Sequence, residues 1–170
     1  MKIKSCLYYL GLSCFPISVM ALMNIFYSFY FDYLDNIISY VSVFFLSLFF
    51  GLIFFYIGRK EKQTISIYEQ LFLVFLVYFL IPLFILMPFY SSGYEVSFID
   101  SYFESVSGLT GTGFTIFEHI KGIDSPLILW RSSSQWIGGF YFLIFLVLIF
   151  SNKHINFKMI GLSFNLEKKI

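Results

Sequence analysis

The chain has 170 residues, of which 59% are hydrophobic, 24% are aromatic and 12% are charged. Its mean hydropathy of +0.83 is far from that of a soluble domain. The net charge of +1, with no basic patch between aromatic residues, argues against nucleic acid as a partner. We therefore predict an all-α integral membrane protein whose many Phe and Tyr side chains face lipid.

Four apolar segments are long enough to cross a hydrocarbon core of about 30 Å, which takes roughly 20 helical residues. They cover residues 5–31, 37–57, 67–90 and about 125–150. Lys2 and Lys4 before the first segment could mark a signal peptide, but the segment exceeds a signal core and no small-residue cleavage site follows it. We predict a retained helix instead, with Pro16 as a kink that neighbouring helices tolerate.

The polar segment 91–125 between the third and fourth spans contains a shorter helix. Apolar residues recur in it at helical spacing: Phe98, Tyr102, Phe103 and Val106. This predicts a helix over 96–109 with one apolar face. The Ser97 hydroxyl can cap its start by accepting from backbone N–H groups two or three residues on. The helix is too short to span, so we predict four transmembrane helices plus one short re-entrant pore helix.

The basic residues indicate the orientation of these spans. Four spans place the N-terminus, the 59–62 loop and the tail at 153–170 on one side of the membrane. That side holds nine of the eleven basic residues, namely Lys2, Lys4, Arg59, Lys60, Lys62, Lys153, Lys158, Lys168 and Lys169. Because cytoplasmic loops carry an excess of Lys and Arg, we predict that both termini are cytoplasmic and that 91–125 enters from outside.

A glycine-spaced turn follows the short helix, with the sequence Ser107-Gly108-Leu109-Thr110-Gly111-Thr112-Gly113-Phe114-Thr115. Irregular backbone survives at membrane depth only when it is buried in protein or lines a watery path. Successive carbonyl oxygens can replace the hydration shell of a cation. Glycine adopts the required conformations at little steric cost, which explains Gly111 and Gly113. We interpret the turn as one quarter of a potassium selectivity filter; the alternative is a Gly/Thr-rich outer turn without an ion.

Two charged residues near the turn have alternative roles. Arg131 either snorkels to lipid headgroups or pairs with Glu104 and braces the filter. Glu104 is likewise either a structural brace or a weak attractor of cations. We expect Gln135 and Trp136 to fix helix packing, and Gly138-Gly139 to permit the close approach of a neighbouring helix.

An enzyme is not expected. The sequence contains no nucleophile–base pair, no phosphate-binding loop and no metal-ligand spacing. His119 and His154 have no second ligand nearby, which argues against a metal or haem site. We expect no organic cofactor and no metal other than the transported potassium ion.

Two runs together carry a family resemblance. They are Phe103-Glu104-Ser105-Val106-Ser107-Gly108-Leu109-Thr110-Gly111-Thr112-Gly113-Phe114-Thr115 and Leu129-Trp130-Arg131-Ser132-Ser133-Ser134-Gln135-Trp136-Ile137-Gly138-Gly139. They resemble the first pore repeat of the TrkH/KtrB (Trk/Ktr/HKT) potassium uptake family, and the two helices before them resemble the extra N-terminal pair of the TrkH branch. The resemblance divides the chain into this pair (1–62), the first helix–pore loop–helix repeat (63–152) and a cytoplasmic or interfacial tail (153–170).

The resemblance implies a role for each residue of the turn. The filter carbonyls would come from Thr110, Gly111, Thr112 and Gly113, with Phe114 at the outer mouth and with Glu104 and Arg131 in support. Two positions depart from the family pattern. Position 111 is glycine where relatives often have threonine, and Phe140-Tyr141 stands where many have methionine-glycine.

The resemblance also implies the surroundings of the chain. The complete family protein joins four such repeats around one pore in the plasma membrane, here the bacterial inner membrane. It dimerises and works with a cytoplasmic nucleotide-binding regulatory subunit. Potassium enters under the membrane potential, and coupling to protons or to sodium, as in a symporter, stays open.

One repeat supplies only a quarter of a coordination cage, so the chain cannot conduct potassium as a monomer. We expect a fragment or split copy of a transporter, or a chain that gathers three further repeats from other chains. The alternative is a non-conducting, degenerate or truncated module that packs against a complete transporter.

Overall fold

The computed structural model describes residues 3–60, 65–118 and 122–151, and for 149–151 only the backbone. The elements of this part are all helices: α1 (Ile3–Tyr30), α2 (Ile37–Gly58), α3 (Ile67–Tyr90), α4 (Phe98–Leu109) and α5 (Ser125–Ser151). The all-helical prediction is confirmed for these residues, and each helix begins within two or three residues of its predicted start. The predicted tail at 153–170, His119 and His154 lie outside the described residues.

Three helices of the described part, α1, α2 and α3, are long and apolar enough to cross a membrane. The chain is therefore a multi-pass membrane protein. Helix α5 has 27 residues and would extend about 40 Å at 1.5 Å per residue. It is not among these three, and its first half contains Arg131, Gln135 and four serines. The fourth span therefore stays a prediction.

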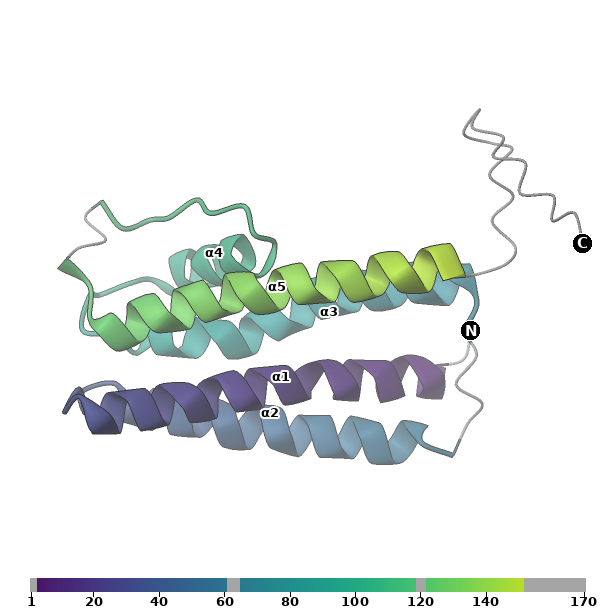
Figure 1. Cartoon of the computed structure of the whole chain (residues 1–170), viewed down its shortest axis with the longest axis horizontal. Coiled ribbons are helices and arrows are strands. Elements are labelled where there is room, and N and C mark those ends of the chain that lie inside the picture. Colours follow the sequence, from purple (N-terminus) through teal and green to yellow (C-terminus); the bar gives the residue numbers. More distant parts are fainter. Residues whose placement is uncertain (1–2, 61–64, 119–121, 152–170) are drawn as a thin grey trace, which may run out of the picture.

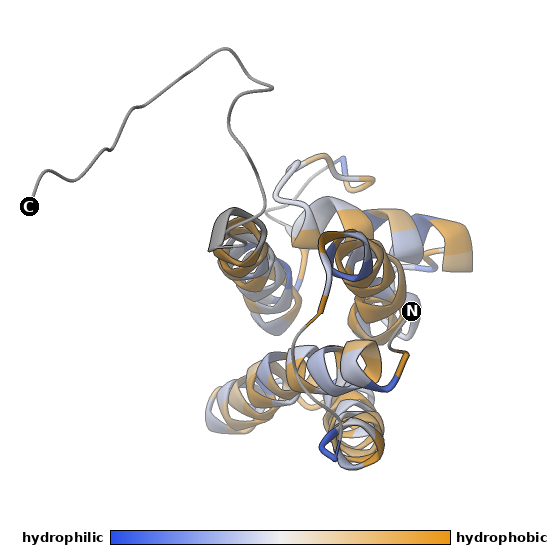
Figure 2. Cartoon of the chain, turned by 90° about the vertical axis from the view of Figure 1, so that its right-hand side faces the viewer, coloured by the Kyte–Doolittle hydropathy of each residue, from blue (hydrophilic) through white to orange (hydrophobic). Residues whose placement is uncertain are grey.

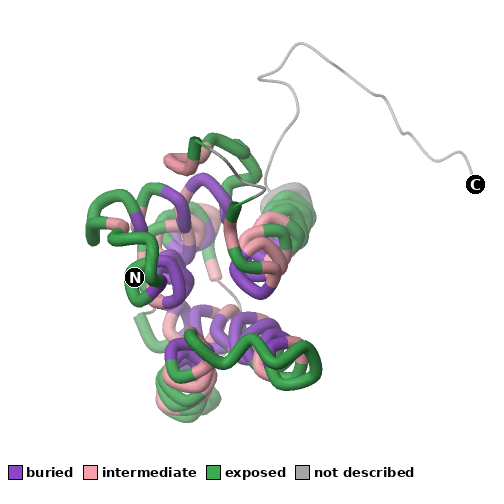
Figure 3. The backbone as a smooth tube through the Cα atoms, turned by 90° about the vertical axis from the view of Figure 1, so that its left-hand side faces the viewer, coloured by how far each residue is buried: buried purple, intermediate pink, exposed green. Residues whose placement is uncertain are grey.

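The long helices lie in two pairs along one axis, α1 with α2 and α3 with α5, while the short α4 lies against α3 and α5 near the end where α5 begins (Figure 1). Hydrophobic residues cover outward as well as inward faces of the long helices (Figure 2). The buried residues gather where the helices face one another (Figure 3). This distribution suits a lipid solvent, because lipid tails accept an apolar outer surface.

Glycines set the spacing between α1 and α2. A Cβ built on Gly11 would lie 2.6 Å from the Phe55 nitrogen and 2.8 Å from the Gly51 oxygen. A Cβ on Gly58 would lie 2.4 Å from the Lys4 oxygen. Small residues allow this close approach, from which helices in a membrane gain van der Waals packing.

The second pair is joined to the first through Trp130 of α5, which is fully buried. Its indole N–H donates to the Ile85 carbonyl of α3 at 2.9 Å. Its ring lies 5.5 Å from that of Tyr40 of α2, between centroids. This residue therefore fixes the first half of α5 against α3 and α2, and so fixes the position of Arg131, the next residue.

Local chemistry determines where α4 and α5 begin. The Ser97 hydroxyl accepts from the Asp100 N–H at 3.2 Å, which confirms the predicted cap of α4. Pro126 lies in the first turn of α5, where its missing N–H has no helical partner to lose.

The apolar face predicted for the short helix points outward only in part: Phe98 and Phe103 are 54% and 46% exposed, whereas Tyr102 and Val106 are half-buried. The buried face ends at Leu109 and otherwise carries small and polar residues: Ser101, Glu104, Ser105, Ser107 and Gly108. Small side chains let α4 approach α3 and α5 closely, and Glu104 finds its polar partners there.

We predict that Gly11→Ala lowers the free energy of unfolding by about 1–3 kcal/mol, because the new methyl group overlaps backbone atoms of α2. Thermal unfolding followed by circular dichroism in detergent measures the change. Gly93→Ala is the matched control, since nothing lies within 4 Å of its Cβ position. Equal melting temperatures for the two variants would contradict glycine-controlled packing.

Candidate functional site

The turn after α4 has an exposed backbone with two glycines in the left-handed region. Thr110 to Phe114 are all exposed. Gly111 has a φ of 69° and Gly113 a φ of 82°. Residues with a Cβ rarely adopt these angles. The prediction that these glycines supply conformations that other residues resist is confirmed.

The amide groups of the turn point at the carbonyl end of α4. The N–H groups of Thr112 and Gly113 donate to the Ser107 oxygen at 3.1 and 3.4 Å, and that of Gly111 donates to the Gly108 oxygen at 3.0 Å. In a planar trans peptide the C=O points opposite to the following N–H. The carbonyl groups of Thr110, Gly111 and Thr112 therefore point away from α4.

These three carbonyl oxygens accept no hydrogen bond from any residue that the structure describes. We refer to these three consecutive carbonyls of exposed residues as the carbonyl row. The threonine hydroxyls brace this row instead of extending it. Thr110 Oγ1 donates to the Val106 oxygen at 2.8 Å and lies 2.6 Å from Thr112 Oγ1.

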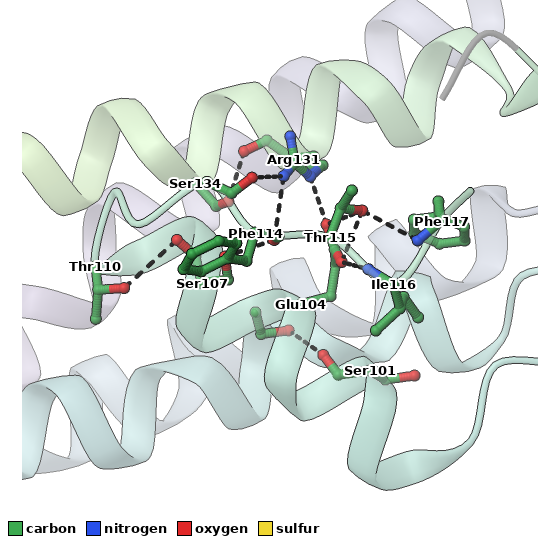
Figure 4. Close-up of polar contacts among 12 residues, drawn as sticks. Ser101, Glu104, Ser107, Thr110, Phe114, Thr115, Ile116, Phe117, Arg131 and Ser134 are labelled. Atoms are coloured by element: carbon green, nitrogen blue, oxygen red, sulfur yellow. Dashed lines mark hydrogen bonds and ion pairs between the residues drawn. The ribbon is translucent and has the colours of Figure 1, made fainter. Parts of the chain in front are cut away.

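The row of free carbonyls ends at Gly113. The Gly113 oxygen accepts from Arg131 Nη2 at 3.0 Å, and the Phe114 oxygen accepts from the same atom at 3.3 Å (Figure 4). The Phe114 oxygen also accepts from Ser107 Oγ at 2.6 Å. The Gly113 carbonyl was predicted as a filter oxygen, but in this structure it is directed to α5 and not to the row.

The carboxylate of Glu104 anchors the chain that leaves the turn. Glu104 has 0% exposure and forms an ion pair with Arg131 Nε. It also accepts from Thr115 Oγ1 at 3.1 Å and from the Ile116 N–H at 3.1 Å (Figure 4). Of the two alternatives for Arg131, partnership with Glu104 is therefore the one observed. A buried charge needs such a partner and full hydrogen bonding.

Helix α5 contacts the end of α4 at Gly138. A Cβ on Gly138 would lie 1.7 Å from the Leu109 oxygen, whereas nothing lies within 4 Å of a Cβ on Gly139. Tyr78 of α3 donates its hydroxyl to the Gly138 oxygen at 3.2 Å. The predicted close approach is confirmed for Gly138 alone. Trp136 was expected to fix helix packing, but it is 81% exposed and does not do so within this chain.

Sequence reasoning missed Ser107 and Thr115, which flank the turn and hold it. Ser107 binds the turn through both its backbone oxygen and its hydroxyl. Thr115 Oγ1 donates to Glu104 and accepts from the Phe117 N–H at 3.2 Å. The hydroxyl groups of these two residues at the ends of the turn are a sequence feature that could have indicated hydrogen bonds to it. However, no regular spacing predicts a bond from Ser107 to a carbonyl seven residues further along the chain.

Among the described residues, no group of three His, Cys, Asp or Glu could hold a metal ion.

Comparison with known proteins finds potassium transporters. The chain is 29% identical to the Trk system potassium uptake protein TrkH of Escherichia coli (strain K12) over 112 residues, which are 65% of this chain and 23% of that protein. It is 42% identical to TrkI of Halomonas elongata over 53 residues, covering 31% and 11% of the two chains. A cation transporter of Methanocaldococcus jannaschii is 28% identical over 103 residues, covering 60% and 22%.

The matched segment thus spans 23% or less of each of these relatives. No family model matches the chain. No solved structure matches it either.

We predict that Glu104→Gln lowers the free energy of unfolding by about 3 kcal/mol, because it leaves the Arg131 side chain, 14% exposed, without its counter-charge. Chemical unfolding in detergent micelles measures the loss. The double variant E104Q/R131Q removes both charges and should recover part of it. Glu118→Gln, at an exposed position, is the control. We call the contacts of Glu104 with Arg131, Thr115 and Ile116 the Glu104 clamp. A loss of stability in Glu118→Gln as large as that in E104Q would contradict a stabilising role of this clamp.

The two adjacent glycines of α5 offer a second test. Gly138→Ala places a methyl group on the Leu109 carbonyl and should destabilise the protein by about 1–3 kcal/mol. Gly139→Ala meets open space, and it should be neutral or gain up to about 1 kcal/mol from helix propensity. Melting temperatures measure both variants. An equal change in melting temperature at both positions would show that α5 does not pack against α4 at Gly138.

Proposed function

Because the chain is homologous to the TrkH and TrkI potassium uptake proteins, we propose that it is an ion-translocating part of a Trk-type potassium uptake system. Residues 1–62 form its N-terminal helix pair and residues 63–152 its first pore repeat. The turn after α4 supplies one quarter of the selectivity filter. Both termini are cytoplasmic, and α5 is a fourth span.

The row of carbonyl oxygens at Thr110, Gly111 and Thr112 is the observation that carries this proposal. A potassium ion that leaves water must regain its oxygen contacts, and carbonyl dipoles can replace its hydration shell. The three oxygens belong to consecutive exposed residues and accept no hydrogen bond from the described residues. The C-terminal end of α4 adds a partial negative charge beneath the turn, which favours a cation.

The clamp around Glu104 supports the same proposal. Carbonyl groups that repel one another stay aligned only on a rigid support. Here the amides of the turn are bonded to the end of α4, and the chain beyond the turn is bonded to Glu104 and Arg131. This support fits a site that must hold its geometry while ions pass.

A single turn cannot surround an ion, so the proposal requires equivalent turns from further pore repeats. They belong to the same polypeptide, to partner chains or to copies of this chain. By resemblance, a cytoplasmic nucleotide-binding subunit regulates the assembly. The membrane potential drives uptake, with about 2.3 kcal/mol per charge per 100 mV.

The second candidate is a non-conducting membrane module. The bond from Arg131 to the Gly113 oxygen favours it, because the fourth predicted filter oxygen is occupied by a protein donor. Growth of a bacterium that lacks its own potassium uptake separates the two candidates. The chain, expressed with its associated repeats, rescues growth at low potassium if it is part of a transporter.

The genomic DNA around the coding region identifies those repeats. We expect three further Thr/Gly pore loops encoded downstream. Where none is encoded, crosslinking in native membranes should give a homotetramer or a complex with a partner chain. If crosslinking leaves the chain monomeric and yields no complex, a filter shared between chains is ruled out.

We predict that Gly113→Ser in the assembled transporter lowers the preference for potassium over sodium roughly fivefold or more. Serine at a φ of 82° costs about 1–2 kcal/mol and disturbs the adjacent carbonyls. Competitive uptake of the two ions measures the preference. Gly122→Ser is the control, because nothing lies within 4 Å of its Cβ position, and an unchanged preference in Gly113→Ser would count against the filter assignment.

A further inference from the structure

One cation is already bonded to the filter turn. Arg131 uses Nε for Glu104 and Nη2 for the carbonyl oxygens of Gly113 and Phe114 (Figure 4). The guanidinium is held in place, because its Glu104 partner has 0% exposure and α5 is fixed by the neighbouring Trp130. A fixed positive charge therefore lies 3.0 Å from the Gly113 oxygen.

A potassium ion and Arg131 cannot both use this oxygen favourably. Two positive charges on one oxygen repel each other. The peptide between Gly113 and Phe114 is planar and turns as a unit. Turning its C=O into the carbonyl row would aim the Phe114 N–H at the guanidinium, so Arg131 opposes the turn.

The turn itself has the freedom for two states. Gly113 has a φ of 82° and open space around its Cβ position, and glycine reaches many backbone angles at little steric cost. The Phe114 N–H donates to no acceptor among the described residues, so its rotation breaks no bond of its own. Among the described residues, the contact that holds the Gly113 C=O in its observed direction is the bond from Arg131 Nη2.

We propose that Arg131 is a latch that holds the Gly113 carbonyl out of the ion path, and that potassium competes with Arg131 for this oxygen. The inference rests on the proposed filter and adds a regulatory step to it. The structure has the latched state, with three carbonyls in the row. Potassium at the Thr112 end of the row draws the fourth carbonyl in and releases the latch.

Arg131→Lys separates the two roles of the arginine. A lysine ammonium can still pair with Glu104, but it is a single point charge and cannot also reach two carbonyl oxygens as a guanidinium fork does. The variant should therefore keep the ion pair with Glu104 and lose the bonds to the Gly113 and Phe114 carbonyls. Arg59→Lys, in the charged segment that follows α2, is the matched control.

The sequence allows the two key carbonyls to be observed separately. Gly111-Thr112 is the one Gly-Thr pair of the chain, and Gly113-Phe114 and Gly139-Phe140 are its two Gly-Phe pairs. Labelling glycine carbonyls with ¹³C and either Thr or Phe nitrogens with ¹⁵N therefore isolates their solid-state NMR signals. Gly139 lies within α5 and is the internal reference.

The experiment titrates potassium against choline on the chain in lipid bilayers, in the assembly in which it is purified. We expect the Gly111 and Gly113 carbonyl signals to shift with potassium, Gly113 at the higher concentration, while Gly139 does not move. In Arg131→Lys the Gly113 midpoint should fall about tenfold, the factor for one lost charge-assisted hydrogen bond. In Arg59→Lys it should not change.

The outcomes separate the latch from the filter. If the Gly111 signal shifts and the Gly113 signal does not, the latch is wrong and the filter stands. An unchanged midpoint in Arg131→Lys, or equal midpoints for Gly111 and Gly113 in the unmodified chain, also overturns the latch. The comparison of the Gly111 and Gly113 midpoints uses only the unmodified chain, so it tests the latch even if Arg131→Lys does not fold. If neither signal responds to potassium, both the latch and the proposed function are wrong.

Discussion

The carboxylate of Glu104 on α4 is buried where α4, the chain beyond the turn and α5 meet, and its partners come from the other two segments. Arg131 supplies the counter-charge from α5, and Thr115 and Ile116 supply donors from the chain that leaves the turn. A buried carboxylate without such partners would be strongly unfavourable, so each partner is required by the others. The pair therefore fixes the distance between α4 and α5 and the path of the chain between them.

Close backbone packing makes this arrangement possible. The Leu109 carbonyl at the end of α4 lies in the space that a side chain at Gly138 would occupy. The serines on the buried face of α4 act in the same way, since they allow close approach to α3 and α5. In lipid no hydrophobic effect drives helices together, so contact between small residues and buried polar pairs carries the association. The side chains of Phe98 and Phe103 on α4 face outward for the same reason.

The same contacts give the turn two unlike faces. The amides of Gly111, Thr112 and Gly113 are bonded to the end of α4, which leaves three carbonyl groups free on the opposite side. The next two carbonyls are bonded to Arg131. One cationic side chain thus supports the turn through Glu104 and limits the length of the free carbonyl row. In the proposed transporter, rigidity and ion access are controlled by the same residue.

The sequence by itself determined what depends on local chemistry. Apolar segments of sufficient length specify the helices, the Ser97 hydroxyl specifies the start of α4, and glycine at positions 111 and 113 specifies left-handed backbone, because each effect acts within a few residues. Tertiary structure alone decided the pairing of Glu104 with Arg131, the outward direction of Phe98 and Phe103, and the bond from Arg131 to the Gly113 carbonyl. Residues 104 and 131 stand on different helices, and no periodicity fixes the rotation of one helix against another. Only packing brings the guanidinium to the turn, and that contact decides which carbonyls are free.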